Sequence, residues 1–266
     1  NDPAYKSFKE ARTSYLEYNQ RKEDSPFRNE NLRKAISYAI NRKSLVNQVL
    51  GDGSVVSTGL VPSGMSKNPK TDEDFAKEAG NLAPYDKEKA KEYWDKAKKE
   101  LKIDKLSFEL MASDTDSSKK VIEYMQSALE ETLPGITVKP TPVPFSVRLD
   151  RSNAGDFDVL LGGWGADYAD PSSFTDLFVT GNSYNRGRWS NEEYDKAVED
   201  SGNKDASDEE ARWDDLQKAN EIISKESGVA PLYQLSEAHL VNEKVKGIVH
   251  HPAGASWDYK WTYVEE

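Results

Sequence analysis

Apolar residues recur at helical spacing in several charge-rich stretches of the chain. In the clearest case, residues 85–101, one face is apolar and the other is filled with lysine, aspartate and glutamate. The residues on this apolar face are Ala90, Tyr93, Trp94, Ala97 and Leu101. The same spacing predicts further helices over residues 32–40, 45–50, 117–132, 190–202 and 207–227. Asn29 or Asn31 is expected to cap the first of these, and Ser207 the last.

Shorter apolar runs predict strands at residues 106–112, 136–143, 157–162 and 229–242. The helix expected at 117–132 separates the first two runs, so they form a β-α-β unit. Such a unit places its two strands parallel, joined by a right-handed crossover. A short helix near 145–153 leads into the third strand.

Composition narrows the possible functions. The chain has 266 residues, a net charge of −11 and no cysteine. This charge disfavours nonspecific binding to nucleic acid or to anionic lipid, because both rely on a basic surface. The lack of cysteine excludes disulfides, thiol nucleophiles and cysteine-ligated metals. No apolar run approaches the roughly 20 residues of a membrane span, and no repeat or linker divides the chain.

The segment GGWGADYADP at residues 162–171 is the most unusual in the chain. An apolar run leads into a tryptophan flanked by glycines, and two aspartates follow. Glycine permits close approach of another backbone, which suits a peptide ligand held through main-chain hydrogen bonds. The alternative is a tight turn with a core tryptophan. In either case Asp170 and Pro171 are expected to start a helix, which leaves Asp167 as the available carboxylate.

Enzyme signatures are mostly missing. The chain lacks a P-loop, a G-x-G-x-x-G after a strand, a G-x-S-x-G and an H-E-x-x-H. His250 and His251 are adjacent, so on a strand they would face opposite sides and make a poor metal pair. A carboxylate-dependent hydrolase remains an alternative, because three aspartates lie close together in sequence and sequence cannot give their separation. These are Asp158, Asp167 and Asp170. We therefore expect no catalysis, no metal and no cofactor.

Five blocks in order resemble the peptide/nickel family of solute-binding proteins of ABC transporters. They are SPFRNENLRKAISYAINRKSLVNQVLGDG, YDKEKAKEYWDKA, FDVLLGGWGADYADPSSF, RWSNEEYDKAVEDS and VAPLYQLSEAHLVNEKVKG. Asn41 stands where the first block has an acidic residue in the family. The blocks span nearly the whole chain and look most similar to the oligopeptide-binding branch.

The resemblance implies an α/β fold: one lobe of a two-lobed, periplasmic-binding-protein-like fold of type II, with a mixed sheet flanked by helices. Residues 1–266 would form the C-terminal lobe, with residues 1–25 and 230–266 near the hinge and leading to a missing N-terminal lobe. The implied function is capture of oligopeptides for an ABC importer, with the permease as partner. The receptor would be extracellular, at the cell surface with a lipid anchor in the full-length protein, or periplasmic. A nickel, haem or sugar binder of the same family is the alternative.

The resemblance also implies roles for individual residues. Asp167 would hold the α-ammonium of the peptide, and the backbone of Gly163 and Gly165 would pair with the peptide main chain. Trp164 would line the cleft, and Phe145 would lie near a side-chain pocket. Two arginines of a related binder align near Ser152 and Leu161, which are not basic. The contacts to the carboxyl end of the ligand are therefore left open.

Overall fold

A six-stranded mixed sheet organises the chain in the computed structural model, which describes residues 4–266. The strand order is β2-β6-β1-β5-β3-β4. Strand β1 runs antiparallel to both β5 and β6, whereas β3 runs parallel to β4 and β5. The strands are β1(Tyr5–Tyr18), β2(Val55–Val56), β3(Leu106–Ser113), β4(Ile136–Val143), β5(Val159–Gly165) and β6(Val229–Leu240).

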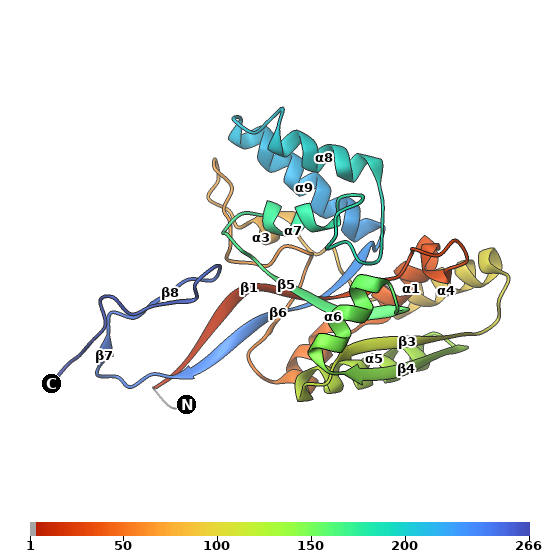
Figure 1. The fold of residues 1–266 in the computed structure, drawn as a ribbon, viewed down its shortest axis with the longest axis horizontal. Helices are drawn as coiled ribbons and strands as arrows, with labels where there is room; N and C mark the ends of the chain where they lie inside the picture. Colours follow the sequence, from red (N-terminus) through yellow and green to blue (C-terminus); the bar gives the residue numbers. More distant parts are fainter. Residues whose placement is uncertain (1–3) are drawn as a thin grey trace.

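Helices gather in two groups on the sheet (Figure 1). One group lies around β3 and β4, and the other lies over β1 and β6. The first group is η1(Pro26–Arg28), α1(Glu30–Ala39), α2(Arg42–Ser44), η2(Leu45–Leu50), α4(Lys87–Leu101), α5(Asp116–Thr132) and α6(Phe145–Ala154). The second group is α3(Phe75–Ala79), α7(Ser172–Thr175), η3(Asp176–Phe178), α8(Glu192–Gly202) and α9(Glu209–Lys225).

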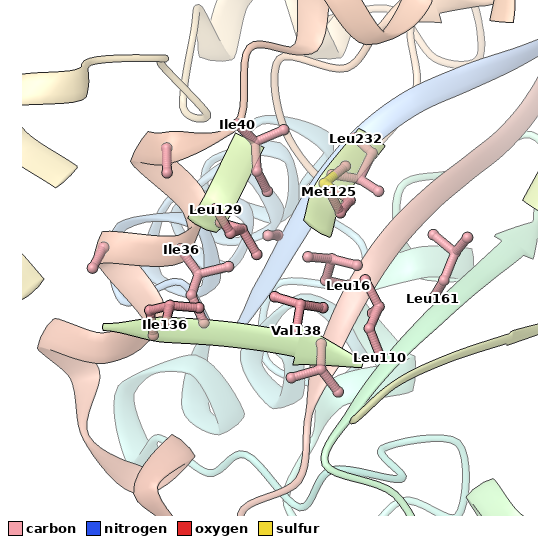
Figure 2. Packing of buried hydrophobic residues seen from close by; sticks show 14 of the residues in the cluster. Leu16, Ile36, Ile40, Leu110, Met125, Leu129, Ile136, Val138, Leu161 and Leu232 are labelled. Carbon is pink, nitrogen blue, oxygen red and sulfur yellow. The ribbon is translucent and has the colours of Figure 1, made fainter. Parts of the chain in front are cut away.

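Strand β1 separates two core clusters, because successive side chains of a strand point to opposite faces. Leu16 and Tyr18 belong to the first core cluster, which includes buried residues of α1, α4 and α5. Ala11 and Tyr15 belong to the second core cluster, which includes buried residues of α7, α8 and α9. Figure 2 shows part of the first cluster, with its labelled residues drawn from β1, α1, α5 and four other strands. Those residues are Leu16, Ile36, Ile40, Leu110, Met125, Leu129, Ile136, Val138, Leu161 and Leu232.

The structure confirms the main elements expected from the pattern and corrects three details. The β-α-β unit is present as β3, α5 and β4, with β3 and β4 parallel. The expected strand 157–162 instead spans Val159–Gly165 and therefore runs through the Gly-Gly-Trp-Gly segment. Helix α9 is capped by Asp208, not Ser207, and α1 is capped by Asn29. Residues 51–84, where the pattern predicted no helix or strand, contain α3, whose Phe75 is buried in the second core cluster.

The outer halves of β1 and β6 leave the body of the molecule as a two-stranded ribbon (Figure 1). Two small two-stranded antiparallel sheets follow, formed by β7(Val245–Lys246) with β10(Tyr263–Val264) and by β8(Val249–His250) with β9(Trp257–Asp258). His250 packs on the rings of Phe8 and Trp257, each at 4.7 Å between centroids, so it fills a small aromatic cluster. In the described part of the chain, no helix is both long and apolar enough to cross a membrane.

Candidate functional site

Strand β5 is paired along its whole length on one edge but only at its start on the other. Strand β1 pairs with every residue from Val159 to Gly165. Strand β3 pairs with Val159 and Leu160 alone. Among the described residues, no strand therefore pairs with the second edge of β5 from Leu161 to Gly165. An edge of this kind presents unpaired backbone groups that another extended chain can join.

The glycines of β5 allow close packing within the sheet itself. A Cβ atom at Gly163 would lie 3.2 Å from the carbonyl oxygen of Thr13 on β1, which is tighter than ordinary contact. A Cβ at Gly165 would lie 3.2 Å from the guanidinium of Arg12. Gly163 thus serves the close approach of the β1 backbone in addition to leaving the backbone of β5 uncovered, whereas at Gly165 the neighbour is the end of a flexible side chain that can move. Only the second of these uses was expected from the sequence.

Trp164 is half-buried on the side of the second core cluster. Its ring meets the ring of Tyr184 edge-on, with 4.8 Å between centroids. Its indole N–H is buried and has no acceptor among the described residues. Tyr184 was not expected from the sequence, because it lies in a polar loop 20 positions further on, with no motif to mark it.

The carboxylate of Asp167 is exposed and has no hydrogen-bond or ion-pair partner in the part of the chain that the structure describes. Its backbone N–H is fixed instead, donating to Ser173 Oγ at 3.0 Å. The turn after β5 therefore holds the backbone of Asp167 in place while its charge faces outward. The sequence had singled out this residue as the available carboxylate, and the geometry agrees with that expectation.

The other two aspartates of the acidic group hold structural bonds. The carboxylate of Asp170 accepts hydrogen bonds from the two terminal guanidinium nitrogens of Arg212, at 2.8 and 2.9 Å. It also accepts a hydrogen bond from the backbone N–H of Ser172 at 2.9 Å. Burial alone raises the pKa of Asp170, but the hydrogen bonds from Arg212 and Ser172 outweigh it and the pKa is lowered. Asp158 accepts the backbone N–H of Glu109 at 2.9 Å. With two of three carboxylates engaged in this way, a catalytic pair is not favoured.

A turn from the far end of the chain lies beside Asp167. The N–H of Gly254 donates to the carbonyl of Ala166 at 3.3 Å, and the N–H of Ala11 donates to Pro252 at 2.7 Å. The turn between β8 and β9 thus borders the end of β5. No feature of the sequence indicated this contact, because it joins segments almost 90 positions apart.

Phe145 lies apart from the other four predicted residues, at the first position of α6. Its side chain is 60% exposed, and the guanidinium of Arg148 lies over its ring at 5.1 Å. Gly163, Trp164, Gly165 and Asp167 are brought together by one strand and the turn that follows it. Phe145 belongs to the helix that precedes this strand in the chain.

Glu17, which lies opposite Leu160 in the β1–β5 register, is a buried carboxylate that sequence reasoning missed. One of its oxygens accepts the N–H of Gly187 at 2.6 Å, and the other is buried without a partner among the described residues. Burial raises its pKa to about 7, against the hydrogen bond from Gly187 and the charge of Arg186. The alternation of β1 could have placed Glu17 on the same face as Tyr15, but only the fold shows that this face is covered.

One group of carboxylates has the spacing of a metal site, and it lies away from β5. Oxygens of Asp200, Asp205 and Asp215 all fall within 4.8 Å of one another; Asp200 lies near the end of α8, Asp205 in the turn that follows, and Asp215 in the second turn of α9. Lys196 pairs with Asp200 and Lys204 with Asp205, which supplies positive charge from the protein itself. Burial and the neighbouring Asp205 raise the pKa of Asp215.

Comparisons with known proteins agree with this architecture. Residues 1–186 match the family of bacterial extracellular solute-binding proteins, family 5 Middle. A dipeptide-binding protein of Lactococcus lactis subsp. cremoris is 40% identical over 270 residues, covering 98% of this chain and 49% of the relative. The chain spans about half the length of the curated relatives it matches.

Two solved structures share the fold. One, described as the peptide-binding protein of a peptide ABC transporter, is 58% identical with a TM-score of 0.82, over 84% of this chain and 98% of that one. Listeria monocytogenes OppA bound to peptide is 37% identical with a TM-score of 0.89, over all of this chain and 51% of that one. The mixed α/β fold is thus that of type II peptide-binding proteins. The chain belongs to the bacterial extracellular solute-binding proteins of family 5.

Proposed function

We propose that this chain is one lobe of an extracellular receptor that captures oligopeptides and delivers them to an ABC importer. The observation that carries the proposal is the edge of β5 from Leu161 to Gly165, which no strand of residues 4–266 pairs and which ends beside the carboxylate of Asp167, also without a partner in that range. A peptide in extended conformation would add to this edge as a further strand. Relatives of the chain are named for binding dipeptides and oligopeptides, which supports a peptide as the ligand.

Main-chain pairing and one fixed charge together would define how the peptide binds. Hydrogen bonds to Gly163 and Gly165 do not depend on the peptide's side chains, so one site accepts many sequences. Asp167 would hold the α-ammonium and so fix the register, with a charge-assisted contribution of about 1.5–3 kcal/mol. Trp164 would line the cleft, and Phe145 would lie near a side-chain pocket.

A second lobe would complete the site. The relatives are about twice as long as this chain, and we infer that a first lobe, joined near residues 1–25 and 230–266, closes over the peptide. Hinge closure of two lobes on a ligand is a common transport mechanism. In this arrangement the whole receptor would be lipid-anchored at the cell surface or periplasmic, and the closed form would dock on the permease of the importer.

Peptides with free or acetylated amino termini test the role of Asp167. In the receptor that contains both lobes, Asp167→Asn should weaken binding of a free-amine peptide by about 10-fold or more, since about 1.4 kcal/mol corresponds to a factor of ten. The N-acetylated form of the same peptide should bind both proteins equally. Isothermal titration calorimetry measures both affinities.

Asp24→Asn is the matched control, because it removes an equal charge from an exposed turn. Equal loss for the free and acetylated peptides would show that Asp167 does not bind the ammonium. Failure of any peptide to bind the wild-type receptor would contradict the proposed function itself.

A further inference from the structure

Four arginines line a cavity beyond the end of β1. The cavity has a volume of about 680 Å³, and its walls come from the turn after β1, from η1 and α1, from the loop before α8 and from the end of α9. The arginines are Arg21, Arg28, Arg33 and Arg188. In a chain of net charge −11, this cavity is a local concentration of positive charge.

The cavity is remote from the residues at which a peptide is proposed. Tyr18, at the end of β1 that leads into the cavity wall, pairs with Val159 at the start of β5, whereas Arg12 pairs with Gly165 at its end. The six residue steps from Arg12 to Tyr18 cover about 20 Å at about 3.3 Å per residue. Asp167 lies beyond Gly165, and none of the five predicted peptide-binding residues lines the cavity. The cavity is therefore a separate site.

Arg33 is the buried member of this group, with 3% of its surface exposed. Its guanidinium donates to five neutral oxygens at 2.9–3.2 Å and makes no ion pair within residues 4–266. The acceptors are the backbone carbonyls of Phe27, Arg28, Glu226 and Ser227 and the side-chain oxygen of Gln20. These bonds satisfy the donors but leave the charge without a counter-charge, which is unfavourable for a buried cation. Burial lowers the pKa of Arg33 accordingly.

The other three arginines of the cavity also make no ion pair in the part of the chain that the structure describes. Arg21 is held by the backbone carbonyls of Arg186 and Asn153, at 2.7 and 3.1 Å. Arg188 donates to one backbone carbonyl at 3.3 Å, and the guanidinium of Arg28 makes no hydrogen bond in that part of the chain. The cavity wall thus carries guanidinium groups with donors left over and no carboxylate attached to them.

Two glutamates line the same cavity, but each is bound to another residue. Glu30 forms an ion pair with Lys34, one turn further along α1. Glu226 Oε1 accepts the side-chain N–H of Asn191 at 2.7 Å. Neither carboxylate pairs with an arginine of the cavity among the described contacts. Four arginines and two glutamates leave an excess of two positive charges, which a dianion would balance.

Two further donors at the cavity have no acceptor among residues 4–266. Arg33 donates to the amide oxygen of Gln20, which fixes the orientation of that amide and leaves its buried Nε2 unbonded. Trp189 is buried, and its indole N–H likewise has no acceptor. Buried donors in proteins normally have a partner. The lining therefore offers more donors and positive charge than acceptors, and this favours an oxyanion as the ligand.

We propose that this cavity binds a phosphoryl group, as inorganic phosphate or as a small phosphate ester. A phosphate monoester carries about −1.5 to −2 charges near pH 7, close to the excess of two positive charges. Its oxygens are acceptors that guanidinium groups bind in pairs. The volume of about 680 Å³ lies within the range of about 300–1,000 Å³ of small-molecule sites, so the organic part of an ester fits as well. The site does not depend on the proposed peptide function.

Calorimetry at constant ionic strength tests the site, with inorganic phosphate and glycerol 3-phosphate as the probes. Succinate, a dicarboxylate of similar charge, is the comparison ligand. The receptor that contains both lobes should bind both phosphates with a dissociation constant of about 1 mM or lower, and about 10-fold more tightly than succinate. Phosphate should also raise the thermal unfolding temperature, because a ligand that binds only the folded state stabilises it.

Two substitutions test the cavity itself. Arg28→Gln and Arg188→Gln change exposed side chains that make few contacts, so both variants should fold, which circular dichroism verifies. Each should weaken phosphate binding by about three- to tenfold. Lys22→Gln is the matched control, because it removes an equal charge from an exposed position next to Arg21 that does not line the cavity. It should leave the phosphate affinity unchanged.

Three results would overturn the site: no phosphate binding at about 10 mM, equal affinity for phosphate and succinate, or an unchanged phosphate affinity in both variants. The first two use the wild-type receptor alone. Vesicles with and without phosphatidic acid distinguish the sources of the phosphoryl group. Cosedimentation that requires phosphatidic acid and is lost in Arg28→Gln would assign the group to a lipid, whereas binding of glycerol 3-phosphate alone would assign it to a soluble ester. None of these measurements requires that a peptide binds.

Discussion

Asp167 and Asp170 lie three positions apart in the turn after β5, yet their carboxylates have opposite surroundings. The carboxylate of Asp170 accepts two hydrogen bonds from Arg212 and one from the backbone N–H of Ser172. Asp167 is exposed and binds nothing in the described chain through its carboxylate. A similar contrast separates Arg212, which is paired, from Arg148, which has no ion-pair partner within residues 4–266. Asp170, which shapes the turn, is satisfied within the protein, whereas Asp167 is exposed at the end of β5, where a peptide is proposed.

Glu17 is intermediate between Asp170 and Asp167, because one of its carboxylate oxygens accepts a hydrogen bond and the other has no partner among the described residues. Burial raises its pKa from 4.5 to about 7, so between these values the folded protein keeps a proton that the unfolded chain has released. Its contribution to stability is fully present below about pH 4.5 and is lost as the pH rises through 7. The free energy of unfolding should therefore fall by about 3 kcal/mol across this window.

Glu17→Gln should remove that fall, since glutamine can still accept from Gly187 and carries no charge. Urea denaturation of both proteins between pH 4.5 and 8 measures the effect. An identical pH dependence in the two proteins would mean that Glu17 is ionised in the fold at low pH, and would place it with the satisfied carboxylates.

Removing the paired carboxylate should have the next largest effect. Asp170→Asn leaves Arg212 without its counter-charge and should lower the free energy of unfolding by about 2 kcal/mol at neutral pH. Because the pKa of Asp170 is lowered in the fold, its contribution is present above the pKa of the unfolded chain. It is lost as the pH falls through the lower folded value. The wild type and the variant should therefore converge in stability at strongly acidic pH.

Asp167→Asn is the control for this measurement and should change stability by less than about 0.5 kcal/mol. Urea denaturation at neutral and acidic pH provides the values for both variants. A loss in Asp167→Asn as large as that in Asp170→Asn would show that the two carboxylates do not differ in role.

The smallest effect is expected at the unpaired arginine. Arg148→Gln removes a half-buried charge that has no hydrogen-bond or ion-pair partner within residues 4–266, so the free energy of unfolding should not fall and should rise by less than about 1 kcal/mol. Arg212→Gln should cost about 2 kcal/mol, like the loss of its partner Asp170. Thermal and urea unfolding of the two variants compare them directly. If Arg148→Gln lowers the free energy of unfolding as much as Arg212→Gln does, both arginines stabilise the fold and the expected contrast between them is wrong.

Much of the fold followed from local pattern. The alternation and helical spacing around residues 106–143 predicted β3, α5 and β4 nearly to their ends, because a β-α-β unit is specified by consecutive segments. The end of β5 was less predictable. Glycines are unfavourable inside a strand, so the sequence pattern predicted that this strand ends at residue 162. In the structure, pairing with β1 extends β5 as far as Gly165. The strand that pairs with β5 consists of residues 12–18, so the end of β5 could not be predicted from the residues next to it in the sequence.

The sequence by itself determined which segment carries the candidate site: a run of glycines, a tryptophan and an unclaimed aspartate, in a family recognisable from five ordered blocks. The tertiary structure decided which edge of β5 stays unpaired and which aspartate is neutralised. It also decided which arginines have a carboxylate partner among the described residues. Arg148, Arg186 and Glu17 come from three distant elements and acquire their charge environment only when α6, β1 and the loop after η3 pack together. Electrostatic environment depends on proximity in space and on burial, and neither is encoded in any single stretch of the chain.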